Sequence, residues 1–206
     1  MTNNTRYNTA TRRTFLATLA AGVAATGCAS MSGGAGWTTL VDGATMTNLN
    51  GFTELGAGGW SLVDGVLQGK GGKLGYLVTK DSYTDFEIRA EFWADEDCNS
   101  GLFMRCQDRS KVDAANAYEV NIFDKRPDPL YGTGAIVDVA KVAQPMPKAA
   151  NRWNTYEVTA KGDRMVVVLN GIQTADARDS KFKSGPVALQ SAGGIIRFRK
   201  VLIRAI

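Results

Sequence analysis

The sequence predicts an all-β protein, built as a two-sheet antiparallel β-sandwich. Gly is abundant, with 23 residues, and short segments that alternate apolar and polar side chains recur at close spacing. Helical periodicity is absent beyond the N-terminal stretch. Many short strands joined by tight turns are typical of sandwiches and jelly rolls, whereas helices would show a period of about 3.6 residues.

Two turn signals place hairpins within the body of the chain. Asp64-Gly65 and Asn170-Gly171 each separate two alternating segments, and both dipeptides favour two-residue hairpin turns because they tolerate positive φ. No repeat and no linker divides residues 37–206, so we expect one domain there. Strands are predicted at residues 61–63, 66–68, 76–79, 86–94, 101–105, 117–123, 155–160, 165–169, 172–175, 187–190 and 195–206.

The N-terminal stretch has the pattern of an export leader. Arg12-Arg13 precedes Phe-Leu and an Ala-rich run, as in a twin-arginine signal peptide, which we place at residues 1–27. The run from Ala25 to Cys28 resembles a lipoprotein processing site, and acylated Cys28 would hold the protein at a membrane through residues 28–36, a Gly/Ser-rich tether. We therefore expect an exported protein of the periplasm or cell envelope. The alternatives are a disordered basic tail and a cleavage site beside an incidental Cys.

Charge and composition exclude some classes of function. The net charge is +4, but the leader holds three of the 24 basic residues and no acid, which leaves 21 basic against 20 acidic side chains. This near-neutral body has no electrostatic basis for binding nucleic acid. The chain has no His, the commonest proton shuttle and metal ligand, so acid–base chemistry falls to carboxylates, Lys, Tyr or Cys, or to a recruited metal. We expect no cofactor and no resident metal, and the oligomeric state stays open.

Period-two alternation sorts the side chains of two central strands by face. The apolar residues Leu102 and Met104 of one strand, and Val120 and Ile122 of the other, favour the core. By the same parity, Arg105, Glu119 and Asn121 lie together on the opposite, outer face. A solvated face of an antiparallel sheet has the same pattern, so this polar set alone does not establish a site.

Two cysteines of the body are predicted to stay unpaired. Cys98 and Cys106 are eight residues apart in a segment that reads as extended, so their Cα atoms lie much farther apart than the roughly 7 Å that a disulfide allows. No His is available to activate either thiol as a nucleophile.

Several motifs then resemble one family, in consistent order from Trp37 to Ile206. Each motif is short, but together they resemble the 3-keto-disaccharide hydrolase-like family, whose fold is a concanavalin-like jelly roll. The motifs are Asn99-Ser100-Gly101 with Arg105, Tyr118 to Asp124 (YEVNIFD), Thr133 to Ile136 (TGAI), Trp153 to Val158 (WNTYEV), Leu169 to Gly171 (LNG), Gly185 to Gln190 (GPVALQ) and Phe198-Arg199.

This resemblance implies cleavage of glycosides already oxidised at C3 of the sugar. A ketone at C3 acidifies the C2 proton, so one carboxylate suffices as the base, and elimination of the C1 substituent follows. Under this interpretation Glu119 is the base and Arg105 stabilises negative charge on the keto oxygen. The alternative for the pair is an ordinary cross-strand ion pair. Side chains expected to bind the small carbohydrate substrate are Glu91, Trp93, Asn121, Asp124, Asp138 and Gln190.

The sequence also departs from the family pattern. Val137 stands where the family has Tyr, and the run Ser191 to Gly194 lacks the usual His-Gly. A non-catalytic carbohydrate-binding surface lipoprotein and a structural envelope lipoprotein therefore remain as alternatives to the enzyme.

Overall fold

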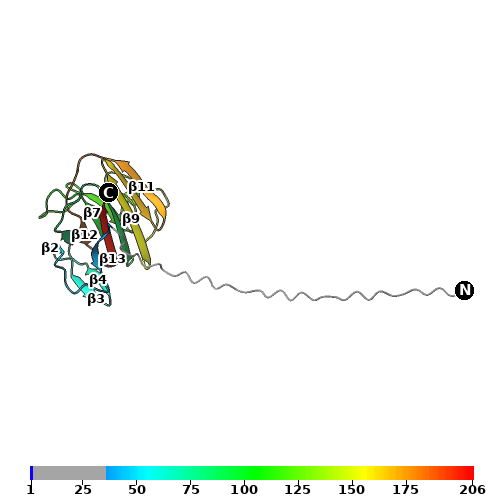
Figure 1. Cartoon of the computed structure of the whole chain (residues 1–206), viewed down its shortest axis with the longest axis horizontal. Helices are drawn as coiled ribbons and strands as arrows, with labels where there is room; N and C mark the ends of the chain where they lie inside the picture. The colour runs from blue at the N-terminus through cyan, green and yellow to red at the C-terminus, as the bar shows by residue number, and fades with distance from the viewer. Residues whose placement is uncertain (2–35) are drawn as a thin grey trace. The chain divides into compact units, whose positions relative to one another are not determined.

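The computed structural model describes Met1 and residues 36–206, and the predicted leader, with Cys28, lies outside the described part. No helix among the described residues is long and apolar enough to cross a membrane. Short strands and one 3₁₀ helix, η1, make up the fold (Figure 1). They are β1 (Thr38–Asp42), β2 (Phe52–Gly56), β3 (Trp60–Val63), β4 (Val66–Lys70), β5 (Gly75–Thr79), β6 (Phe86–Ala94), β7 (Ser100–Met104), β8 (Tyr118–Ile122), η1 (Pro129–Tyr131), β9 (Trp153–Lys161), β10 (Arg164–Leu169), β11 (Ile172–Arg178), β12 (Ala188–Ser191) and β13 (Ile195–Ala205).

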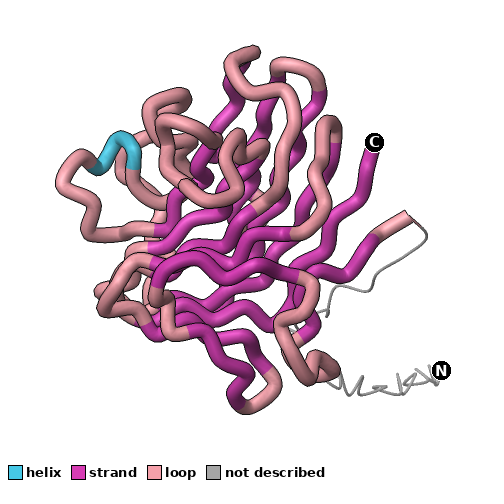
Figure 2. Tube along the Cα trace, turned by 90° about the vertical axis from the view of Figure 1, so that its left-hand side faces the viewer, coloured by secondary structure: helices cyan, strands magenta, loops and turns pink. Residues whose placement is uncertain are grey.

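The strands form two antiparallel sheets, as predicted. The large sheet has eight strands in the order β11-β10-β9-β6-β13-β4-β3, with β1 also paired to β13. The small sheet has five strands in the order β2-β5-β12-β7-β8. Figure 2 shows the loops, together with η1 in cyan, gathered over one side of the strands. The all-β sandwich is therefore confirmed.

Both predicted hairpins are present. Asp64-Gly65 joins β3 to β4 with φ of 49° and 74°, and Asn170-Gly171 joins β10 to β11 with φ of 51° and 81°. Positive φ at both central positions is the geometry that two-residue hairpins need to match strand twist. We did not predict β1 or β2, although Asp42-Gly43 lies at the end of β1 and Asn50-Gly51 lies directly before β2. Neither dipeptide joins a hairpin, because β1 pairs with β13 and β2 pairs with β5.

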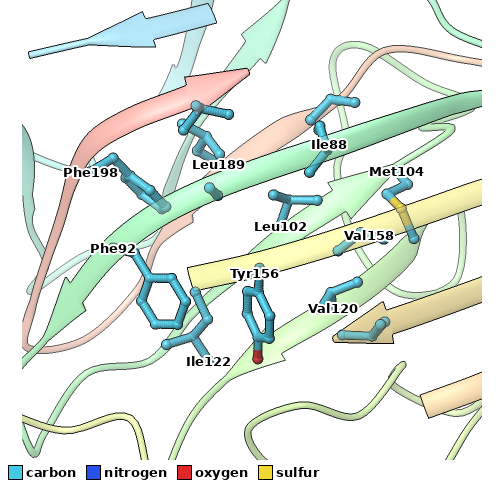
Figure 3. Packing of buried hydrophobic residues seen from close by; sticks show 14 of the residues in the cluster. Ile88, Phe92, Leu102, Met104, Val120, Ile122, Tyr156, Val158, Leu189 and Phe198 are labelled. Carbon is cyan, nitrogen blue, oxygen red and sulfur yellow. The ribbon is translucent and has the colours of Figure 1, made fainter. Parts of the chain in front are cut away.

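The core fills the space between the two sheets (Figure 3). Phe92 of the large sheet stacks on Tyr156 with ring centroids 4.9 Å apart, and the Tyr156 hydroxyl donates to the Asn121 carbonyl at 2.6 Å. Burial raises the pKa of Tyr156, so this hydroxyl stays a donor. The residues predicted to face inward from β7 and β8 do so: Leu102, Met104, Val120 and Ile122.

A long segment, residues 123–150, connects β8 to β9 and is anchored by Asp124. Its carboxylate accepts hydrogen bonds from the Thr133 hydroxyl at 2.6 Å and from the backbone N–H groups of Ala149 and Ala150 at 2.9 and 3.0 Å. Asp124 was expected to bind substrate, but these contacts occupy its carboxylate within the loop. Its placement indicates a structural role instead.

The Arg105 side chain does not lie on the outer face that strand alternation predicts for it. Its φ is +53°, so the alternation of β7 ends there and the side chain turns toward the protein interior. The guanidinium is 1% exposed and donates to the carbonyls of Thr84 at 2.6 Å, Gly162 at 2.8 Å and Phe182 at 3.2 Å, with Asp85 as its ion-pair partner at 3.3 Å. The prediction that Arg105 shares the outer face with Glu119 is therefore wrong, because it assumed an extended conformation at this residue.

These contacts predict a structural effect for Arg105→Met. The variant leaves several buried carbonyls without a donor, so we expect the free energy of unfolding to fall by about 3 kcal/mol. Urea denaturation followed by tryptophan fluorescence measures this change. A variant as stable as the wild type would contradict the structural role.

Candidate active site

The outer face of the small sheet carries two cross-strand rows of side chains. In the first row, strand pairing places Tyr76 opposite Gln190 and Gly101 opposite Asn121. In the second row, two residues farther along the strands, Phe103 lies between Ala188 and Glu119. The first row therefore runs across β5, β12, β7 and β8, with a glycine in the middle. The second row places Glu119 beside an aromatic ring. Members of the two rows are Tyr76, Gln190, Gly101 and Asn121, and Val78, Ala188, Phe103 and Glu119.

Gly101 leaves a notch in the first row. A Cβ at this position would lie 2.9 Å from Glu119 Oε1 and 3.3 Å from the Phe103 ring. The Glu119 carboxyl group therefore leans into space that any other residue at position 101 would fill. This is a physical reason for glycine in the NSG motif, and it depends on space rather than on backbone conformation.

Two buried amide oxygens border the notch without hydrogen-bond partners. Asn121 is fully buried and Gln190 is 7% exposed, yet Asn121 Oδ1 and Gln190 Oε1 accept no hydrogen bond. Their NH₂ groups are used: Asn121 Nδ2 donates to the Tyr131 carbonyl at 2.7 Å, and Gln190 Nε2 to the Tyr76 hydroxyl at 3.4 Å. Unpaired buried acceptors are costly, so they favour a ligand that supplies hydroxyl donors.

Glu119 has the electrostatics of a base that works near neutral pH. Glu119 is 7% exposed, and its pKa is raised to about 7, mainly by desolvation; Arg126 opposes this shift and Asp138 contributes to it. A carboxyl group with this pKa is half ionised at neutrality, which suits proton abstraction in a protein without His. Glu119, Asn121 and Gln190 thus lie on one face of the small sheet, and for Glu119 and Asn121 this is the arrangement that strand alternation predicts.

Arg126, which sequence reasoning missed, is the cation that acts on Glu119. It lies just after β8, where its backbone N–H donates to the Phe123 carbonyl at 3.4 Å. The side chain is half-buried, and no carboxylate of the described residues is within ion-pair distance of it. The one available signal was its position directly after the strand that carries Glu119. Asp138, at the exposed tip of a turn with φ of +61°, adds a second carboxylate on this side.

Glu91 and Trp93 lie on the other outer face of the sandwich. Both belong to β6 of the large sheet, and their neighbour Phe92 points into the core, so they point away from the small sheet. Glu91 is buried in an ion pair with Arg199, and the Arg197 guanidinium covers the Trp93 ring at 4.8 Å. The prediction that these residues bind the same substrate as Glu119 is therefore wrong. Alternation along a strand indicates which side chains share a face, but it does not indicate which of the two sheets contains the strand.

The two cysteines of the described body do not supply a nucleophile. Cys98 and Cys106 are unpaired and buried, as predicted, and burial raises the pKa of the Cys106 thiol to about 12. Such thiols stay protonated at neutral pH and are poor nucleophiles. Among the described residues, no group of three or more His, Cys, Asp or Glu side chains is placed to hold a metal ion.

The raised pKa of Glu119 makes stability depend on pH with a defined sign. Between about pH 4.5 and 7 the folded state keeps the Glu119 proton while the unfolded state releases it, so the folded state loses stability as pH rises. Glu119→Gln removes this loss. We expect the melting temperature of Glu119→Gln minus that of the wild type to be larger at pH 8 than at pH 4.5. Differential scanning fluorimetry measures both temperatures. An equal difference at both pH values would contradict a shifted pKa.

The chain is similar in structure to several known proteins. A protein from Parabacteroides distasonis ATCC 8503 that is provisionally named a glycosyl hydrolase is 24% identical, with a TM-score of 0.68, and the alignment covers 82% of this chain and 99% of that one. A second such protein from the same organism is 18% identical, with a TM-score of 0.71, covering 83% and 94%. The carbohydrate-binding module CBM66 from Bacillus subtilis is 20% identical, with a TM-score of 0.56, covering 82% and 96%.

These likenesses show the fold, and the sequence comparison shows the family. No curated protein matches the chain. Residues 36–204, however, match the family of 3-keto-alpha-glucoside-1,2-lyase-like domains. This match covers far more than half of the chain and agrees with the motifs of β7 and β8 that build the notch. The chain therefore belongs to the 3-keto-alpha-glucoside-1,2-lyase-like family.

Proposed function

We propose that this protein cleaves 3-keto-glycosides by elimination, with Glu119 as the catalytic base. The observation that carries the proposal is the Glu119 carboxyl group, with a pKa of about 7, at a notch bordered by two unpartnered amide oxygens. Family membership supports the substrate class, since the family is named for lyase chemistry on 3-keto-glucosides. Neither a cofactor nor His is needed for such a reaction.

The reaction balances with the residues at the notch. Glu119 takes the C2 proton, and the electron pair of the C2–H bond moves into an enolate whose charge lies on the C3 oxygen. The enolate then re-forms the ketone and a C1–C2 double bond while the C1–O bond breaks. The leaving oxygen takes a proton, which protonated Glu119 is placed to return. Addition of water across the double bond would complete hydrolysis.

Arg126 replaces Arg105 as the proposed stabiliser of the enolate. A preorganised cation acts most strongly where charge develops in a site that excludes water. Arg126 has no carboxylate partner among the described residues, whereas the Arg105 guanidinium is already used by three backbone carbonyls. The role therefore moves from a buried structural arginine to a half-buried one in the loop after β8.

Asn121 and Gln190 are proposed to bind sugar hydroxyls. Each side chain keeps one acceptor oxygen without a hydrogen-bond partner, and a sugar hydroxyl would supply the missing donor. Both oxygens are buried, so a sugar hydroxyl reaches them only after the residues that cover them move. A carbohydrate-binding module would use the same amides, so binding without cleavage is the alternative outcome of the test below.

We also propose that the protein is exported and anchored through acylated Cys28. The support is the Arg12-Arg13 pattern with its Ala-rich run and the small residues before the cysteine. The described body begins within ten residues of Cys28, so the tether would keep the notch near the membrane surface.

The proposal predicts how cleavage depends on the substrate, the base and pH. The protein should release the leaving group from 3-keto-glycosides and not from their unoxidised parents. Glu119→Gln should lower kcat/KM at least about a hundredfold, since a general base contributes that much, while Glu157→Gln on the opposite sheet should not. For the wild type, kcat/KM should rise with pH and level off above about 7, where Glu119 is ionised. Stopped assays of the released alcohol measure all three.

A second variant tests the notch itself. Gly101→Ala places a methyl group where Glu119 Oε1 and the substrate meet, so cleavage should fall roughly tenfold or more while the fold persists. Undiminished cleavage by Glu119→Gln would remove Glu119 as the base. Saturable sugar binding without any cleavage would favour the carbohydrate-binding alternative.

A further inference from the structure

A groove runs along the free edge of β11, beside the proposed site. Two hollows form it, of about 700 and 380 Å³, and they share Val142, Ala143, Gln173 and Thr174, so they are continuous. The first lies between residues 139–143 and β11. The second extends to residues 145–147 and the β10–β11 turn. Their sizes fall within the range of small-molecule sites.

The groove begins at the turn that borders Glu119. The turn closes where the Ala140 N–H donates to the Ile136 carbonyl at 2.8 Å, and the Val137 N–H donates to the Glu119 carbonyl at 2.9 Å. Val139 and Ala140, which follow Asp138 in this turn, line the first hollow. The turn therefore has Glu119 on one side and the groove on the other, with exposed Asp138 at its tip.

The lining of the groove changes along its length. The first hollow presents the polar side chains of Lys141, Gln173 and Thr174, next to the turn. The second is largely apolar and includes Pro145 and Ile172. The Ile172 side chain is 69% exposed, the largest exposure of an apolar residue within the folded body. A single exposed apolar residue is common on protein surfaces, but Ile172 ends a groove whose other lining is largely apolar, so it extends an apolar surface that an apolar part of a ligand could cover.

We infer that this groove binds the leaving part of the substrate, with a hydroxylated unit in the polar hollow and an apolar end against Ile172. The inference rests on the proposed function and names its substrate class: keto-glycosides whose leaving group ends in an apolar, ring-like moiety. The 3-keto sugar would sit at the Gly101 notch, and the leaving group would cross Asp138 into the groove. No bond changes in the groove, so its contribution is binding energy alone.

The arrangement predicts a preference along a substrate series. We expect the full-length chain to cleave a 3-keto-disaccharide that carries a phenyl aglycone with a kcat/KM at least about tenfold above that of the same 3-keto-disaccharide without it. Methyl 3-keto-glucoside, which does not reach the second hollow, should be slowest. An apolar group in a matching pocket contributes about tenfold or more.

Ile172→Asp tests the apolar end, and Val63→Asp is its matched control. Both residues are exposed and lie beside a tight hairpin turn of the large sheet, but Val63 is far from the groove in the fold. Ile172→Asp should abolish the preference for the phenyl substrate and leave methyl 3-keto-glucoside unaffected. Val63→Asp should keep both rates.

The outcomes separate the two proposals. Cleavage of methyl 3-keto-glucoside with no phenyl preference, or a preference that survives Ile172→Asp, overturns the groove inference and leaves the proposed function standing. Failure to cleave any keto-glycoside overturns both.

Discussion

The pairing of edge strand β8 with the segment that follows it is the constraint on which the site depends. Gly134 N–H donates to the Asn121 carbonyl at 3.1 Å, Asn121 N–H to the Ala135 carbonyl at 3.1 Å, and Val137 N–H to the Glu119 carbonyl at 2.9 Å. An edge strand exposes unpaired backbone groups, and this segment satisfies them. It thereby fixes the strand that carries Glu119, whose burial is the main cause of its raised pKa.

The same pairing is supported from the large sheet. Gly134 has a φ of +92°, and a Cβ there would lie 3.0 Å from the Thr174 Cβ atom of β11, so the segment passes close against the edge of the other sheet. Asp124 fixes its far end through the amides of Ala149 and Ala150. The segment thus closes one side of the sandwich, and the notch and the groove lie on its two sides.

Much of the fold was predictable, because strand periodicity and turn chemistry are local properties. The strand at 86–94 and both hairpins follow from alternation and from the Asp-Gly and Asn-Gly turns. The inward set of β7 and β8 follows from parity, and so does the outward position of Glu119 and Asn121. The resemblance then supplied the family, which the comparison with residues 36–204 confirmed.

The rest depends on contacts between distant residues. A single positive φ at Arg105 reverses the alternation, and no pattern of neighbouring residues indicates it. Glu91 and Trp93 point outward, as alternation predicts, but from the large sheet instead of the small one. The sequence of a single strand does not indicate which sheet that strand joins. Arg126 reaches the site only through the path of a long irregular segment. The same segment carries Asp138, which the family resemblance indicated and strand alternation could not. For the same reason, the unpartnered oxygens of Asn121 and Gln190 become visible only in three dimensions.

The central claim is that burial at the notch makes Glu119 a base at neutral pH. The direct test is a pH titration of the Glu119 side-chain carboxyl by ¹³C NMR, assigned by comparison with Glu119→Gln. The account predicts a pKa of about 7, with the other glutamates in the described body serving as internal references. A Glu119 pKa at the ordinary value of about 4.3 would contradict the account, since the carboxylate would then be an exposed or fully paired surface group.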